Sequence, residues 1–109
     1  MNVEHKNLAD GKWSTMPLVN QLAHVGSEVH RALSWQAKDN RDYCLKAASR
    51  ALELLDLTLD TAKFPQLKEI ARLRESIVDY FWATNQFKST KTSFEKYFLG
   101  FNYAARKNL

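Results

Sequence analysis

The stretch EIARLRESIVDYF, from Glu69 to Phe81, has the spacing of an amphipathic helix. Its apolar side chains recur every three or four residues, the interval that brings side chains to one face of an α-helix. Arg74 falls on that face. An unpaired guanidinium in a core is strongly unfavourable, so Arg74 must have a partner or reach solvent. Its apolar companions on the face are Ile70, Ile77, Val78 and Phe81.

The sequence allows several partners for the Arg74 guanidinium. A carboxylate on a neighbouring helix or within its own helix would form an ion pair. The aliphatic stem could also lie along the core with the charged head at its rim. A second chain or an anionic ligand could supply the counter-charge instead. The carboxylates within reach by sequence are Glu28, Glu53, Asp56, Glu75 and Asp79.

Helical periodicity extends over most of the chain. The predicted helices cover about 16–38, 40–62, 65–84 and 92–107, joined by short polar connections. Short connections favour antiparallel neighbours. We therefore predict an all-α, antiparallel up-down four-helix bundle. It forms a single domain over 1–109, with residues 1–13 as an N-terminal arm that carries Trp13.

The helix ends are predicted from capping residues and from proline and asparagine at helix boundaries. Gly26 lies in the middle of the first helix on its apolar side, where it costs up to about 1 kcal/mol against alanine. Close approach of another helix would explain it, and a cofactor contact is the alternative. The end signals are Ser14 or Thr15 for the first helix, Asp39 or Asn40 for the second, Pro65 and Asn85 for the third, and a Thr92–Glu95 capping box for the fourth.

Composition excludes several classes of protein. A chain of 109 residues with 45% hydrophobic and 26% charged residues is typical of one globular domain. Three glycines and two prolines are too few for a barrel or sandwich of short strands. The single Cys44 excludes a disulfide framework and a multi-cysteine zinc site. No apolar run of about 18 residues occurs, and the N-terminus lacks a signal-peptide pattern, so we expect a cytoplasmic protein without a membrane span.

The net charge of +4 is unevenly distributed. Residues 1–84 carry 11 Lys and Arg and 11 Asp and Glu, so the whole surplus lies in residues 85–109. Such a surplus indicates either ordinary solubility and helix-end charges or an anionic partner. The candidate anion-binding residues are Lys88, Lys91, Lys96, Arg106 and Lys107.

The first predicted helix has a polar face that offers metal and interface candidates. His24 and Glu28 are four residues apart, a spacing at which two side chains can share a metal. A ferritin-like di-metal site needs Glu-x-x-His pairs, which this sequence lacks, so we expect a solvated face and no metal. Arg31 and Trp35 lie on the same face, and both residue types are typical interface anchors. Trp35 either packs beneath a loop or the N-terminal arm, or meets another subunit, and Trp82 is a further interface candidate.

Catalytic residues are scarce. Cys44 falls on the apolar stripe of the second helix, where a thiol behaves as a small hydrophobic group. The three histidines lie within residues 5–30, and no glycine-rich phosphate loop occurs. We expect no cofactor and no enzymatic activity.

Four blocks of the sequence resemble a family of small prokaryotic helical proteins. The blocks are QLAHVGSEVHRAL, RALELLDLTL, LKEIARLRESIVDYF and KYFLGFNYAAR, within residues 13–106. The resemblance implies a four-helix bundle and no particular activity. The chain is more loosely similar to HEPN-type bundles and to the substrate-binding partners of nucleotidyltransferases, which are often dimeric. Nuclease-type HEPN proteins have a late arginine followed by histidine, and no histidine follows His30 here.

Two functions remain on this basis. The first is a non-enzymatic protein-interaction module that forms a homodimer or binds another protein. The second is a nucleic-acid or nucleotide-binding module that uses the basic final quarter of the chain.

Overall fold

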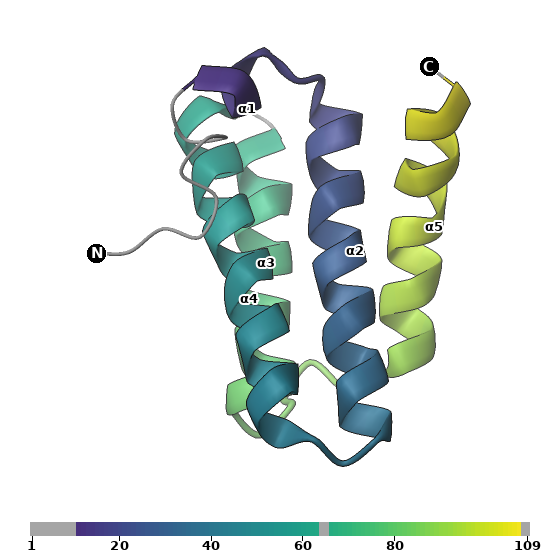
Figure 1. Ribbon diagram of the computed structural model, residues 1–109. Coiled ribbons are helices and arrows are strands. Elements are labelled where there is room, and N and C mark those ends of the chain that lie inside the picture. The colour runs from purple at the N-terminus through teal and green to yellow at the C-terminus, as the bar shows by residue number, and fades with distance from the viewer. Residues whose placement is uncertain (1–10, 64–65, 108–109) are drawn as a thin grey trace.

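The computed structural model describes residues 11–63 and 66–107 (Figure 1). All secondary structure in this part of the chain is helical. The long helices lie side by side, with α2 between α3 and α5 and with α4 against α3 (Figure 1). The helices are α1 (Trp13–Thr15), α2 (Leu18–Ala37), α3 (Arg41–Thr61), α4 (Gln66–Trp82) and α5 (Lys91–Lys107).

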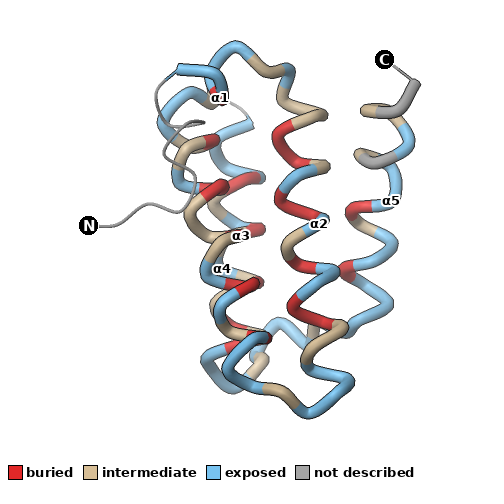
Figure 2. The backbone as a smooth tube through the Cα atoms, in the orientation of Figure 1, coloured by how far each residue is buried: buried red, intermediate tan, exposed pale blue. Residues whose placement is uncertain are grey.

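The apolar stripes predicted from the sequence form the core. Their buried positions line the sides of the helices that face one another (Figure 2). None of the described helices combines the length and apolar character needed to cross a bilayer. The core contains Leu22, Val25, Val29, Ala32, Leu33, Cys44, Ala47, Ala48, Ala51, Leu54, Leu55, Ile70, Leu73, Ile77, Phe81, Phe94 and Phe98.

The prediction that Arg74 lies on the apolar face of α4 is wrong. The buried stripe of this helix runs through Ile70, Leu73, Ile77 and Phe81, and Arg74 flanks it with 37% of its side chain exposed. Its Nε donates to Asp56 Oδ1 of α3 at 2.7 Å. Leu73 takes the core position beside it, so the guanidinium stays at the surface and a carboxylate expected from the sequence supplies its counter-charge.

Trp13 was expected in an N-terminal arm, and this prediction is also wrong. The residue belongs to α1 and is 1% exposed. Its indole Nε1 donates to Thr58 Oγ1 at 3.0 Å, and the Thr58 hydroxyl donates to the carbonyl of Leu54 at 3.0 Å. The Gln21 amide donates to the Trp13 carbonyl at 2.8 Å. The short α1 therefore extends the core at one end of the helices. The rest of the predicted arm, residues 1–10, lies outside the described residues.

Two of the predicted helix caps are wrong. Ser14 and Thr15 donate to carbonyls three residues earlier, and α2 begins after Pro17 without a side-chain cap. The cap of α5 is Thr90, which exchanges two hydrogen bonds with Ser93 at 2.8 and 3.0 Å. The capping box of α5 therefore lies at Thr90 and Ser93, two residues before the predicted pair Thr92 and Glu95.

The other helix ends agree with the sequence where they are described. Asn40 accepts from the backbone N–H of Tyr43 at 3.1 Å and caps α3. Asn85 has φ 57° and ends the turn after α4, as expected for a left-handed residue. Pro65 lies outside the described residues.

Asp79 organises the connection between α4 and α5. Its carboxylate is 8% exposed and accepts from the backbone N–H groups of Gln86 at 2.8 Å and Phe87 at 3.0 Å. The Asn85 N–H donates to the Asp79 carbonyl at 3.1 Å. Sequence reasoning had considered Asp79 only as a partner for Arg74. Burial of this acid is favourable because backbone donors satisfy it.

Gly26 allows α5 to approach α2 closely. A Cβ at this position would lie 2.8 Å from Phe98 Cδ1 and Cγ and 2.9 Å from Phe98 Cβ. These distances are too short for carbon atoms, so only glycine fits without a shift of α5. The expectation of a close helix approach is confirmed for this glycine.

Substituting Gly26 by alanine should lower the free energy of unfolding by about 1–3 kcal/mol, because the new methyl overpacks the α2–α5 contact. Urea denaturation followed by circular dichroism measures this. Gly100→Ala in α5 is the matched control, since nothing lies within 4 Å of the methyl it would add. It should leave the free energy unchanged or raise it by up to about 1 kcal/mol. Equal destabilisation by both changes would contradict the close approach at Gly26.

Thr58→Val should lower the free energy of unfolding by about 1–3 kcal/mol, because it leaves the buried indole N–H of Trp13 without an acceptor. Thr58→Ser keeps the hydroxyl and removes one buried methyl, which costs about 0.8 kcal/mol. The same urea titration compares the two variants. A Thr58→Val protein as stable as Thr58→Ser would show that the Trp13–Thr58 hydrogen bond contributes little.

Candidate functional site

A hollow of about 770 Å³ lies between α2 and α5, beside the Gly26–Phe98 contact. Its floor consists of buried residues from both helices, and the residues that surround the floor are mostly polar. Two of the surrounding residues, Arg31 and Trp35, are interface candidates from the sequence. The floor contains Gly26, Val29, Leu33, Phe94 and Phe98, and the walls contain Ser27, His30, Arg31, Ser34, Trp35, Lys38, Glu95 and Leu99.

An exposed apolar ridge on α5 adjoins this hollow. Leu99 is 66% exposed and Tyr103 is 67% exposed. They are four residues apart and so lie on the same side of the helix. From Leu99 onward, no described residue of α5 is buried, whereas Phe94 and Phe98 in its first half are (Figure 2). The second half of α5 thus presents apolar surface that the other described residues, 11–63 and 66–90, leave exposed.

Trp35 holds one end of the hollow in a fixed geometry. It is partly buried, and its ring contacts Tyr43 of α3 edge-to-face with centroids 4.9 Å apart. Lys38 Nζ lies 5.1 Å from the centroid of the Trp35 ring. Trp35 therefore packs against its own chain, on Tyr43 of α3. Its ring also forms part of the wall of the hollow.

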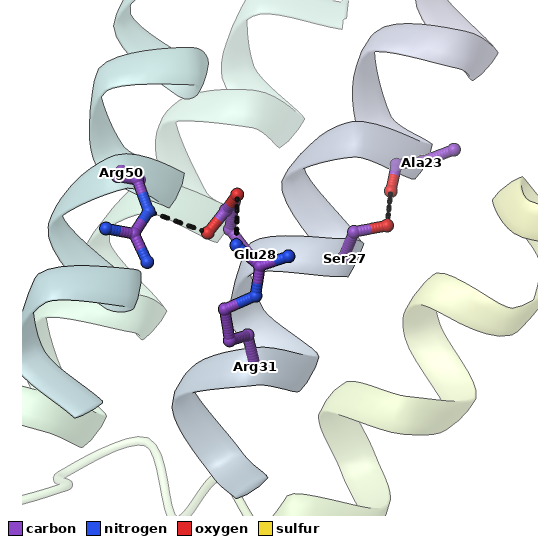
Figure 3. Close-up of polar contacts among 5 residues, drawn as sticks. All are labelled: Ala23, Ser27, Glu28, Arg31 and Arg50. Atoms are coloured by element: carbon purple, nitrogen blue, oxygen red, sulfur yellow. Dashed lines mark hydrogen bonds and ion pairs between the residues drawn. The ribbon is translucent and has the colours of Figure 1, made fainter. Parts of the chain in front are cut away.

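Glu28 joins α2 to α3 through two arginines. Its side chain is 13% exposed, and it accepts from Arg50 Nε at 3.1 Å and from Arg31 Nη1 at 3.4 Å. Figure 3 shows Arg50 reaching from α3 to Glu28, with Ser27 on the side of α2 nearer α5. Sequence reasoning paired Glu28 with Arg31 and His24, and it missed Arg50 because 22 residues separate the two positions.

His24 is exposed, and its ring centroid lies 5.8 Å from that of Trp13. No group of three His, Cys, Asp or Glu side chains that could hold a metal ion occurs among residues 11–63 and 66–107. Glu28 is engaged by Arg31 and Arg50, and the His24 ring lies against Trp13.

The remaining interface candidates lie elsewhere. Arg74 is paired with Asp56 across α4 and α3. Trp82 is 40% exposed at the end of α4, with its ring centroid 6.2 Å from that of Phe81. Neither residue lines the hollow, so the interface candidates chosen from the sequence do not form one patch.

The basic final quarter is spread along α5. Lys88 is exposed in the loop before α5, Lys91 is exposed at the first position of the helix, and Lys96 is exposed in its second turn. Arg106 and Lys107 belong to its last turn, about 24 Å from Lys91 along an α-helix. Lys91 Nζ also lies 3.9 Å from Glu95 Oε1. The surplus positive charge therefore does not collect at one point.

Two titratable groups have shifted pKa values. Burial raises the pKa of the Cys44 thiol, and the nearby Arg41 opposes this only in part. A protonated thiol in the core is a poor nucleophile. Burial also raises the pKa of Tyr97 above its ordinary value of 10.0, assisted by its hydrogen bond to Glu69 Oε1 at 3.0 Å and by the charge of that carboxylate. The Tyr97 hydroxyl links α5 to α4.

No protein-family model, curated protein or solved structure matches this chain. The resemblance to small prokaryotic helical proteins and to HEPN-type bundles therefore stays a prediction.

The raised pKa of Tyr97 predicts a loss of stability in alkaline solution. Since the folded state holds the proton more tightly than the unfolded state, the contribution is complete below about pH 10 and is lost as the pH rises above it. Tyr97→Phe should therefore reduce the decline in urea midpoint between pH 9 and 11. The raised pKa of the Cys44 thiol also lowers stability at high pH, but it does so equally in wild type and in Tyr97→Phe. If the urea midpoints of wild type and Tyr97→Phe fall in parallel with pH, the loss of stability does not come from Tyr97.

Proposed function

We propose that this protein is a non-enzymatic, cytoplasmic interaction module that forms a homodimer. We further propose that its fold is an antiparallel up-down four-helix bundle made by α2 to α5, with α1 packed at one end. A single observation carries the functional proposal. The α2–α5 hollow, with Arg31 and Trp35 in its walls, lies beside the exposed Leu99–Tyr103 ridge.

The composition of this surface supports protein binding over chemistry. A hollow with an apolar floor and a surrounding set of polar side chains has the anatomy of an interface core and rim. Trp, Tyr and Arg are enriched among the residues that dominate binding energy. The one cysteine among the described residues is buried away from this surface, in the core of α3.

Nucleic-acid binding is the second candidate function. It is supported by three exposed lysines, Lys88 in the loop before α5 and Lys91 and Lys96 in the first half of that helix. Phe87, which is 57% exposed, and the exposed Lys88 stand in the same loop. An exposed aromatic ring next to a cation can stack a base above a phosphate. The separation of these lysines from Arg106 and Lys107 weakens this candidate, because the full charge surplus cannot act on one short segment.

Size-exclusion chromatography with light scattering and the 260/280 nm absorbance ratio tests the two functions together. The homodimeric interaction module predicts a mass near twice 12.6 kDa and the 260/280 nm absorbance ratio of a protein without nucleic acid. Arg31→Ala or Trp35→Ala should then weaken the dimer at least about tenfold, because each removes an anchor worth more than about 1.4 kcal/mol. A monomer with excess absorbance at 260 nm would support the second function instead.

The charge-reversal pair Lys88→Glu with Lys91→Glu is the matched control. These changes should leave the dimer intact if the first function holds. They should abolish salt-sensitive binding to RNA if the second holds, since phosphate contacts release counterions. A monomeric protein that binds no RNA would contradict both functions.

A further inference from the structure

We infer that each copy in the homodimer inserts the Leu99–Tyr103 ridge of its α5 into the α2–α5 hollow of the other copy. The two α2–α5 pairs then surround a two-fold axis that runs along the helices. This inference rests on the proposed function and adds to it the position and symmetry of the contact.

Shape is the first argument. A two-fold interface uses the same patch on both subunits, so that patch must contain both a concave part and a part that fits it. The hollow of about 770 Å³ is the concave part, and the ridge with two-thirds of Leu99 and Tyr103 exposed is the convex part. Leu99 belongs to both, because it lines the hollow and begins the ridge. The hollow and the ridge therefore adjoin on one face.

Helix direction is the second argument. Figure 1 shows that the chain runs along α2 and α5 in opposite directions, and Gly26 of α2 meets Phe98 of α5 near the middle of both helices. A two-fold axis along the helices gives the incoming α5 the same direction as the resident α5. Each α2 then runs antiparallel both to its own α5 and to the incoming α5, which brings opposite helix-dipole ends of α2 and α5 together.

Charge is the third argument. On the α2 side, the hollow is lined by Arg31 and by Lys38, which follows the last residue of α2, and the α5 wall carries Glu95. Because the two α5 helices run in the same direction, the incoming Glu95 lies level with the resident Glu95, facing the cationic α2 wall. The reverse direction would move it along the helix, away from these cations. The present contact of Glu95 with Lys91, at 3.9 Å between exposed side chains, is loose enough to exchange.

Sedimentation equilibrium of two leucine variants tests the position of the contact. Leu99→Asp puts a carboxylate on the ridge and should raise the dimer dissociation constant at least about tenfold. Leu67→Asp is the matched control, since Leu67 is a 39% exposed leucine on α4, outside the hollow. It should leave the dissociation constant within about twofold of wild type. Circular dichroism checks that both variants are folded.

A charge reversal tests the orientation. Glu95→Arg should weaken the dimer at least about tenfold, because it would place a cation against Arg31 and Lys38. Adding Arg31→Glu to this variant should restore at least part of the loss. If Leu99→Asp fails to fold, this pair decides the question, since Glu95 and Arg31 are both exposed.

The outcomes separate the two proposals. A dimer that withstands Leu99→Asp and Glu95→Arg would overturn this docking arrangement and leave the homodimer itself in place on another face. A wild-type protein that stays monomeric at every concentration would overturn both. Dissociation by Leu99→Asp and by Glu95→Arg, together with rescue by Arg31→Glu, is the result expected.

Discussion

The close contact between Gly26 of α2 and Phe98 of α5 is the constraint on which the rest of the arrangement depends. It brings the backbone of α2 against an aromatic side chain that any larger residue would displace. Since α2 also packs against α3, it is the main connection between α5 and the remainder of the core, and aromatic contacts of Phe94 with α4 add to it. The hollow lies beside the same contact, so the packing that attaches α5 also creates the surface to which we assign binding.

The charged contacts lie around this core and not within it. Arg74 with Asp56, and Glu28 with Arg50, join neighbouring helices at partly exposed positions. Exposed ion pairs of this kind contribute at most about 1 kcal/mol each. Their role is to match helix surfaces, while apolar burial supplies most of the stability. Two buried polar groups, the Trp13 indole N–H and the Asp79 carboxylate, are instead satisfied by hydrogen bonds within the chain.

The surface of α5 connects the fold with the proposed function. Its first half is covered by α2 and by the aromatic side chains at the end of α4, where Phe94 lies 5.2 Å from Tyr80 between ring centroids. Its second half presents Leu99 and Tyr103 to the outside. An edge helix of this kind can accept another helix without any change in the core. A second copy of the same face would cover the apolar surface that α5 exposes.

Periodicity and capping are local properties of the chain, and they were enough to predict the four long helices to within about two residues at each end and the close approach at Gly26, but not the short α1. Tertiary structure alone decided the rest. Whether Arg74 is buried depends on which of two adjacent residues, Leu73 or Arg74, takes the core position of α4. Trp13 enters the core because Thr58, 45 residues away, accepts its N–H. The pairing of Glu28 with Arg50 and the hollow beside Phe98 likewise require residues distant in sequence to meet, and no local pattern encodes such meetings.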